Sequence, residues 1–311
     1  MTAFIATFRR FWAKVGRGLA HPAVMPGIAI AGGVFVFTVV SYAMRGDPLI
    51  GYDAHAYYQA AALDDPYRAT INGGFDAAGG LYEYKYPPPL AQILHPIRVL
   101  GISWPAFLGA WTILLLVSLA WMGRRWTLLL FLFPPVLGEL WLGNLNILIG
   151  AAVVVGMRYP ASWSFIILTK ITPGIGLIWF AVRREWRSLA IALVATVIVV
   201  GVSFVLAPWL WSDFIEASKT QVGATVNVPR QAAPIPLPLR LVFVAVLVAW
   251  AARTDRAWLL PIGVALAVPF LWWNAFAIAV AAVPLYAWRP SAKTAATEPD
   301  GAPAPVPAHT G

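Results

Sequence analysis

The sequence has 311 residues, of which 60% are hydrophobic and only 11% are charged. Soluble domains carry about 25% charged residues, so this deficit indicates a protein whose main solvent is lipid. Cysteine is absent, which excludes a disulfide framework, a thiolate nucleophile and a thiolate metal site. The net charge of +9 would suit a nucleic-acid partner only if the basic residues formed a binding stripe.

The first predicted element is the apolar run 24–44. It is long enough for a helix to span about 30 Å of hydrocarbon. Basic residues precede it, as they would in a signal peptide, but no small-residue cleavage site follows it. We therefore expect a retained first helix, with residues 1–23 as a cytoplasmic N-terminal segment.

Further apolar segments follow along the chain. They cover 104–122, 127–141, 146–157, 161–182, 188–207, 236–252, 257–271 and 274–288. Lys170, Pro173 and Gly174 interrupt 161–182, which predicts two short helices meeting at a break. Segment 89–100 is short and polar, so it should lie at the interface or re-enter the membrane. The pattern predicts an all-α polytopic membrane protein with about 8–10 transmembrane helices.

The charged residues test this topology, because cytoplasmic loops of membrane proteins carry an excess of Lys and Arg. An alternating thread places 14 basic residues on one side and 9 of the 13 acidic residues on the other. The basic set is Arg9, Arg10, Lys14, Arg17, Arg124, Arg125, Arg158, Arg183, Arg184, Arg187, Arg253, Arg256, Arg289 and Lys293. The acidic set is Asp47, Asp53, Asp64, Asp65, Asp76, Glu83, Glu139, Asp213 and Glu216. The basic excess is therefore a topology signal, which argues against a nucleic-acid partner.

This topology predicts a multi-pass protein of the cell membrane with both termini in the cytoplasm. The transmembrane domain should cover 24–289, with external loops at 45–88 and 208–236. The tail 290–311 is rich in Ala, Pro and Thr and has no apolar periodicity. It should therefore be a disordered cytoplasmic segment.

The first external loop opens with GYDAHAYYQAA, a stretch able to form a short interface helix. On that helix Asp53 and Tyr57 share a face, four residues apart, and so do Ala54 and Tyr58. A carboxylate near an apolar groove has a route to a raised pKa and to general-base chemistry. The alternative is that Asp53 simply caps the Ala-rich helix that follows it.

The same loop ends in YEYKYPPP, which gathers Tyr84, Lys85 and Tyr86 in front of a proline stop. Tyrosine rings can stack on sugar faces and their hydroxyls can bind sugar hydroxyls. Lys85 can meet a phosphate as a point charge. The alternative is that these tyrosines only anchor the chain at the membrane interface.

The turn GELWLGNLNILIG places Asn144 and Asn146 between two apolar helices, with Glu139 nearby. Buried polar side chains at membrane depth are costly unless they are partnered or face a wet cavity. A helix beginning near Asn146 would also direct its N-terminal amides toward an anion. Ordinary helix capping by the two asparagines is the alternative.

Lys170 stands in the middle of an apolar segment, and an intramembrane ionisable residue is by default a functional-site hypothesis. At a broken helix tip its ammonium would suit a phosphate or pyrophosphate, and a salt bridge to an outer acid is the alternative. His55, His95 and Asn274 are weaker candidates. No His and carboxylate residues have metal-ligand spacing and no Gly-rich phosphate loop follows a strand, so neither a metal nor a cofactor is expected.

Four of these elements occur in an order shared with a known family. They are Asp53 with Tyr57, Tyr58, Ala60 and Ala61; Tyr84 and Tyr86 with Pro87 and Pro88; Gly143 with Asn146; and Lys170 with Pro173 ahead of Arg183, Arg184, Glu185, Trp186 and Arg187. On these elements the chain resembles glycosyltransferase family 87 over residues 24–290. It differs at Asn144, where Gln is usual.

The resemblance implies a C-type glycosyltransferase fold with an outward-facing active-site cavity. It implies transfer of a hexose, with mannose expected, from a polyprenyl-phosphate donor to a lipid or glycan acceptor amid membrane lipid. Asp53 would be the general base of an inverting reaction and Lys170 would stabilise the leaving phosphate. The paired and proline-flanked tyrosines, Lys85 and the two asparagines would bind substrate. A transporter or flippase, or a non-catalytic binder of lipid-linked sugars, would use the same polar groups.

Overall fold

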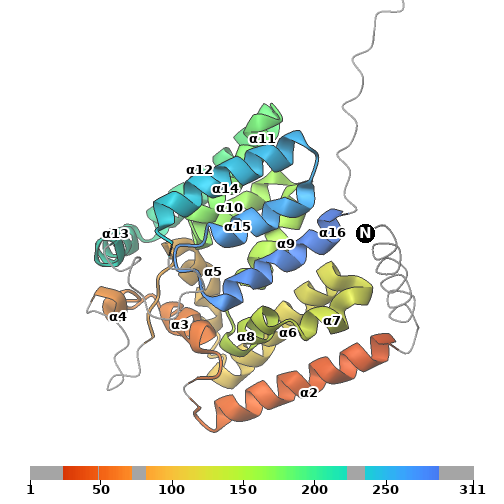
Figure 1. Ribbon diagram of the computed structural model, residues 1–311. Helices are drawn as coiled ribbons and strands as arrows, with labels where there is room; N and C mark the ends of the chain where they lie inside the picture. Colours follow the sequence, from red (N-terminus) through yellow and green to blue (C-terminus); the bar gives the residue numbers. More distant parts are fainter. Residues whose placement is uncertain (1–23, 48, 72–81, 223–234, 287–311) are drawn as a thin grey trace, which may run out of the picture.

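The computed structural model describes residues 24–47, 49–71, 82–222 and 235–286, and within these ranges the chain forms helices and no strand (Figure 1). The predicted N-terminal segment 1–23, the tail 290–311 and parts of both external loops lie outside the described residues. The α-helices are α2 (Val24–Met44), α3 (Tyr52–Ala60), α4 (Arg68–Ile71), α5 (Pro88–Val99), α6 (Trp104–Gly123), α7 (Thr127–Phe131), α8 (Pro134–Leu142), α9 (Asn146–Gly156), α10 (Trp163–Thr169), α11 (Ile178–Val182), α12 (Trp186–Leu206), α13 (Pro208–Val222), α14 (Leu237–Arg253), α15 (Leu260–Leu266) and α16 (Ala282–Tyr286). The 3-10 segments are η1 (Arg124–Trp126), η2 (Pro160–Ser162), η3 (Thr172–Leu177), η4 (Ala257–Leu259) and η5 (Trp273–Ala281).

Long apolar helices form the outside of the molecule. Only 11% of the apolar window is buried inside the protein in both α2 and α12, and α6 and α14 also expose many large apolar side chains. Exposed apolar surface on this scale would be unfavourable in water. These helix faces are therefore the ones that contact lipid, which confirms an all-α polytopic membrane protein.

The number of full-length spans is smaller than the 8–10 transmembrane helices that the sequence predicts. Among the described residues, 3 helices are long and apolar enough to cross a membrane, or up to 4 if α8 and α9, bent by 110°, count as one span. The predicted helix 127–141 is broken at Phe133, whose backbone is extended ahead of Pro134 and Pro135. Proline disfavours the helical conformation in the residue before it, so the apolar run divides into α7 and α8.

The predicted break in 161–182 is confirmed. Helix α10 ends at Thr169, and Lys170 takes an extended conformation with φ −140° and ψ 106°. The chain then continues through η3, with Pro173 in its first turn, into α11. Lys170 consequently lies at the tip of a broken helix, where its side chain is not committed to a helix face.

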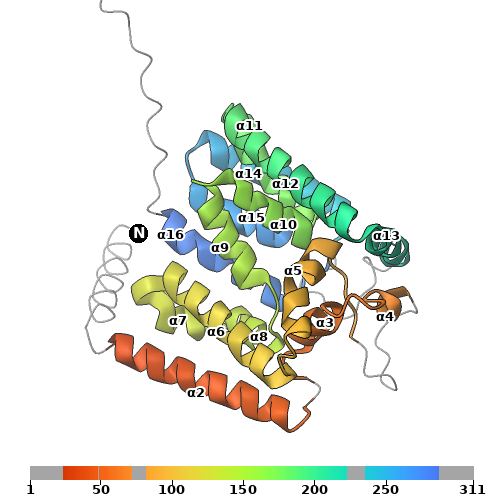
Figure 2. The same cartoon turned by 180° about the vertical axis from the view of Figure 1, so that it is seen from behind.

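The helix ends gather in two groups at opposite ends of the molecule. Helices α3, α4, α5 and α13 cluster at one end, on the left of Figure 1 and on the right of Figure 2. At the other end the turns after α11 and α14 meet, because Arg183 forms an ion pair with Asp255. The basic turns around Arg183 and Arg253 therefore lie together, as the alternating thread requires, while the cellular side of each end stays a prediction.

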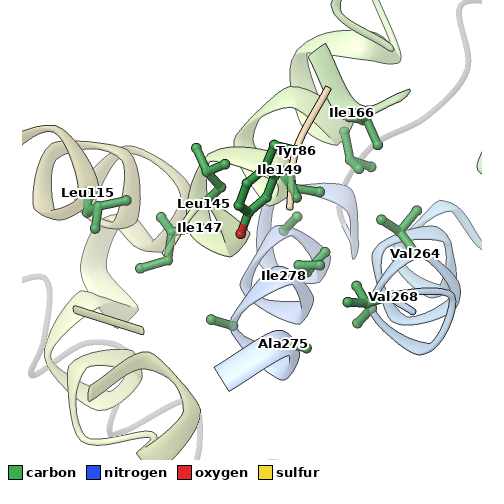
Figure 3. Close-up of a cluster of buried hydrophobic side chains, with 14 of the residues drawn as sticks. Tyr86, Leu115, Leu145, Ile147, Ile149, Ile166, Val264, Val268, Ala275 and Ile278 are labelled. Atoms are coloured by element: carbon green, nitrogen blue, oxygen red, sulfur yellow. The ribbon is translucent and has the colours of Figure 1, made fainter. Parts of the chain in front are cut away.

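The core lies where α9 packs against η5. Figure 3 shows Leu145, Ile147 and Ile149 beside Ile278, with Tyr86 reaching in between them. Gly150 of α9 permits this close approach, because an added Cβ would lie 3.0 Å from the carbonyl oxygen of Ile278. The first turn of α9, which carries Asn146, is thus fixed against this core.

Candidate active site

The start of helix α3 is held by a backbone contact with α8. Gly51 has a left-handed backbone with φ 63°, which favours glycine, and its amide donates to the carbonyl of Trp141 in α8 at 2.8 Å. Gly51 is the N-cap of α3, and no side chain caps this helix. Asp53, in the first turn, is therefore not the capping residue, and its carboxylate is available for other contacts.

The partner of Asp53 is Asn144, in the turn between α8 and α9. The Nδ2 of Asn144 donates to the Oδ2 of Asp53 at 2.7 Å. Gly143 makes the contact possible, because it is left-handed with φ 68° and an added Cβ would lie 2.7 Å from that of Ala54. The indole of Trp111 fixes the same turn by donating to the carbonyl of Gly143 at 2.8 Å.

Lys170 completes a chain of polar contacts that begins at Asp53. Its Nζ donates to the Oδ1 of Asn144 at 3.3 Å and to the Oδ1 of Asn146 at 2.7 Å. The amide of Leu145 also donates to the Oδ1 of Asn144 at 2.7 Å, which fixes the orientation of that side chain. Within the described residues no ion pair joins Lys170 to an acid, so the alternative of a simple salt bridge is not what the structure contains.

Glu139 extends the network on its far side. This carboxylate accepts from the Nδ2 of Asn146 at 2.8 Å, from the amide of Ile147 at 3.2 Å and from the Nδ2 of Asn274 at 3.1 Å. It also accepts from the backbone amide of Asn146. The sequence places Glu139 at this turn but indicates no role for it, and Asn274 is a weak candidate there. The available signal was an intramembrane acid just ahead of a polar helix start.

The two charged ends of the chain from Asp53 to Lys170 reach the surface, whereas the groups between and behind them do not. Asp53 and Lys170 are half-buried, but Glu139 is 0% exposed and Asn146 is 1% exposed. Burial raises the pKa of the Asp53 carboxyl above its ordinary value. The hydrogen bond from Asn144 and the positive charges of Lys170 and Lys85 offset part of this rise.

Tyr57 and Tyr86 lie against the network from α3 and from the chain ahead of α5. Their hydroxyls are 3.0 Å apart, and Tyr67 donates to the carbonyl of Tyr86 at 2.8 Å. Burial raises the pKa of both phenols, Tyr57 and Tyr86, so both stay protonated. The carboxylate of Asp53 lies close enough to both phenols to raise their pKa further.

The other predicted substrate-binding residues lie outside this network. The Tyr84 hydroxyl donates to the carbonyl of Pro87 at 3.2 Å and accepts from the amide of Ala91 at 3.0 Å, so it organises the start of α5. Tyr58 donates to the carbonyl of Ile102 at 2.8 Å. Lys85 pairs with Glu83 at 2.5 Å. A direct role for these residues in substrate binding stays a prediction.

The two histidines in the described ranges, His55 and His95, serve packing and local hydrogen bonding. His55 is stacked between Trp104 and Tyr82, with ring centroids 4.2 Å and 4.3 Å away, and burial lowers its pKa to about 4. The Nδ1 of His95 lies 2.8 Å from the carbonyl oxygen of Ala61. Over the described ranges, no three His, Cys, Asp or Glu residues are grouped to hold a metal ion.

These observations define an integral membrane protein with a polar, charged site at one end of its lipid-facing helices. The sequence model of glycosyltransferase family 87 matches residues 84–297, and the chain belongs to that family. The matched region contains Asn144, Asn146 and Lys170 but begins after Asp53, which the fold brings to them. No curated relative and no solved structure matches the chain.

Proposed function

We propose that this glycosyltransferase moves a sugar, with mannose as the expected one, from a polyprenyl-phosphate donor to a hydroxyl of a lipid or glycan acceptor on the outer face of the cell membrane. Family membership supports sugar transfer. The observation that carries the rest is the contact chain from Asp53 through Asn144 to Lys170. It supports the proposal because a carboxylate and an ammonium, both half-buried, contact the same amide.

Asp53 is the general base in this proposal. Its raised pKa makes the carboxylate a better proton acceptor, and within the described residues its one hydrogen bond comes from Asn144. The acceptor hydroxyl transfers its proton to Asp53 while its oxygen forms a bond to the anomeric carbon of the donor. The bond from that carbon to the phosphate oxygen breaks, and the configuration of the carbon is inverted.

Lys170 stabilises the leaving group. An ammonium has three N–H donors, and two of them are directed to the oxygens of Asn144 and Asn146. The third is free to meet the phosphate oxygen on which negative charge develops as the sugar leaves. A cation already held in place at that point stabilises the transition state without further reorganisation.

The test is transfer from polyprenyl-phosphate mannose by the purified protein in liposomes. Asp53→Asn keeps the shape of the side chain and removes the base, so we expect transfer to fall by about 10²-fold or more. Lys170→Ala should weaken use of the donor. Near-normal turnover by a folded Asp53→Asn variant would show that this assignment is wrong.

The competing functions are a transporter or flippase and a non-catalytic binder of lipid-linked sugars. A transporter or flippase would move the intact donor across the membrane, and a non-catalytic binder would retain it without cleavage. Scoring the same liposomes for released polyprenyl phosphate separates the three, because only the transferase breaks the bond between sugar and phosphate.

A further inference from the structure

Glu139 is a fully buried acid that the proposed mechanism leaves without a task. It is 0% exposed, and its carboxylate accepts hydrogen bonds from the backbone amides of Asn146 and Ile147 and from the side chains of Asn146 and Asn274. An ionised carboxylate only accepts hydrogen bonds. Each neighbour must therefore present an N–H group to Glu139.

This requirement fixes the orientation of the Asn146 side chain. Its Nδ2 faces Glu139 at 2.8 Å, so its Oδ1 faces the opposite way and accepts from the ammonium of Lys170 at 2.7 Å. The reversed amide would turn its oxygen toward the carboxylate and its NH₂ group toward the ammonium. Both contacts would then be repulsive.

We propose that Glu139 is a positioning residue for Lys170. Acting through Asn146, it holds the ammonium at the place where the donor phosphate is bound. A lysine side chain is long and flexible, and its shorter contact in the network is the one to Asn146 rather than to Asn144. The inference rests on the proposed function only for the identity of the phosphate.

A structural role for Glu139 must be separated from this one. The same carboxylate receives the first amides of α9 and lies across the bend of 110° between α8 and α9. Its loss alone would therefore be ambiguous. Asn146 offers a way to separate the two roles, because a carboxylate in its place accepts from Lys170 in either orientation of the side chain.

The experiment compares Glu139→Gln with the double variant Glu139→Gln/Asn146→Asp. In the single variant the backbone amides of Asn146 and Ile147 keep the Gln oxygen on their side, so the new NH₂ group faces the Nδ2 of Asn146. The side-chain amide of Asn146 then turns, and Lys170 loses its anchor. In the double variant the number of carboxylates is unchanged, and the new carboxylate at position 146 accepts from the new amide and from Lys170. Glu216→Gln is the matched control, since Glu216 lies on α13 and is paired with Lys219.

Transfer is measured with polyprenyl-phosphate mannose as the probe. For Glu139→Gln we expect the KM for this donor to rise by about tenfold or more, since a hydrogen bond to a charged group is lost. The KM for the acceptor should stay near its original value, and the double variant should regain the donor KM. An unchanged donor KM in the single variant, or no recovery in the double variant, would overturn the inference.

A second readout does not depend on catalysis. Lysine is incorporated with ¹³C at its ε-carbon, which leaves all three N–H donors of Lys170 in place, and the Lys170 signal is assigned by its loss in Lys170→Arg. We expect this signal to move in Glu139→Gln, to return in the double variant and to stay in place in Glu216→Gln. Absence of transfer by the unmodified protein would contradict the proposed function, whereas an unmoved Lys170 signal in Glu139→Gln would overturn the role of Glu139.

Discussion

The carboxylate of Asp53 and the ammonium of Lys170 contact opposite ends of a single amide, that of Asn144. The Nδ2 of Asn144 donates to Asp53 at 2.7 Å, and its Oδ1 accepts from Lys170 at 3.3 Å. In a direct ion pair the carboxylate and the ammonium would occupy each other's hydrogen-bonding groups. The intervening amide keeps them close while leaving an acceptor on Asp53 and a donor on Lys170 for other groups.

Removing this amide should shift the pH dependence of catalysis. The hydrogen bond from Asn144 lowers the pKa of Asp53, against the larger effect of burial, which raises it. In Asn144→Ala the pKa of Asp53 should therefore rise further. Since a general base works only when ionised, the acidic limb of kcat/KM against pH should move to higher pH by about one unit.

Asn144→Gln is the matched comparison, because it keeps the amide and lengthens the side chain by one methylene. We expect it to restore most of the pH profile of the unmodified protein. An acidic limb that stays at the same pH in Asn144→Ala would show that Asp53 does not act as the titrating base.

Much of this site can be predicted from the sequence, for a topological reason. Asp53, Asn144 and Lys170 each follow an odd number of predicted crossings, so an alternating chain brings all three to the same end. The hydrogen bonds of Glu139 could not be predicted in this way. They depend on the bend of 110° between α8 and α9 and on the left-handed turn at Gly143. These features set the direction in which each side chain points, whereas the alternating chain predicts only the side of the membrane.

The sequence also cannot predict which tyrosine hydroxyls are available to bind a sugar. Tyr57, Tyr58 and Tyr84 all have a side chain that suits sugar binding. The sequence alone gives no means of deciding which of them would contact the sugar. Their burial and partners separate them, because Tyr84 is committed to the start of α5 while Tyr57 lies beside the network. Such differences arise from tertiary packing, which residue spacing does not encode.

The contact between Tyr57 and Tyr86 predicts a measurable coupling in stability. Their hydroxyls are 3.0 Å apart and buried. Each single change, Tyr57→Phe or Tyr86→Phe, should reduce the free energy of unfolding by about 1 kcal/mol. Because the shared hydrogen bond is lost only once, the double variant should cost about 1 kcal/mol less than the sum of the singles. Strictly additive losses in detergent unfolding experiments would contradict a direct bond between these hydroxyls.

His55 predicts a pH-dependent stability. Burial lowers its pKa from 6.5 to about 4, so between these values the unfolded chain binds a proton that the folded protein does not. Its contribution to stability is therefore complete above pH 6.5 and is lost as the pH falls toward 4. His55→Phe keeps a ring between Trp104 and Tyr82 and cannot be protonated. We expect its Tm to fall less than that of the unmodified protein on acidification, and parallel Tm curves would refute this.

Arg240 predicts a stability effect in a region that the sequence did not single out. This buried side chain donates to the carbonyls of Leu266, Val268 and Pro269 at 3.0, 2.9 and 2.7 Å, and to that of Ile235 at 3.1 Å. It therefore closes the C-terminal end of α15, where helix carbonyls lack partners of their own. The neighbouring carbonyl of Ala267 accepts from Thr172, two residues after Lys170, at 2.5 Å.

Arg240→Met should accordingly lower the free energy of unfolding by about 3 kcal/mol, because one buried and three partly buried carbonyls lose their donor at once. Arg240→Lys should recover only part of the loss, since its donors all radiate from one nitrogen and cannot reproduce the planar fork. Arg253→Met is the control, because Arg253 is an exposed residue at the other end of the same helix. Thermal unfolding in detergent measures all three variants. Equal Tm values for Arg240→Met and Arg253→Met would contradict the assignment of Arg240 as the donor that closes α15. Full recovery of the Tm by Arg240→Lys would contradict it as well.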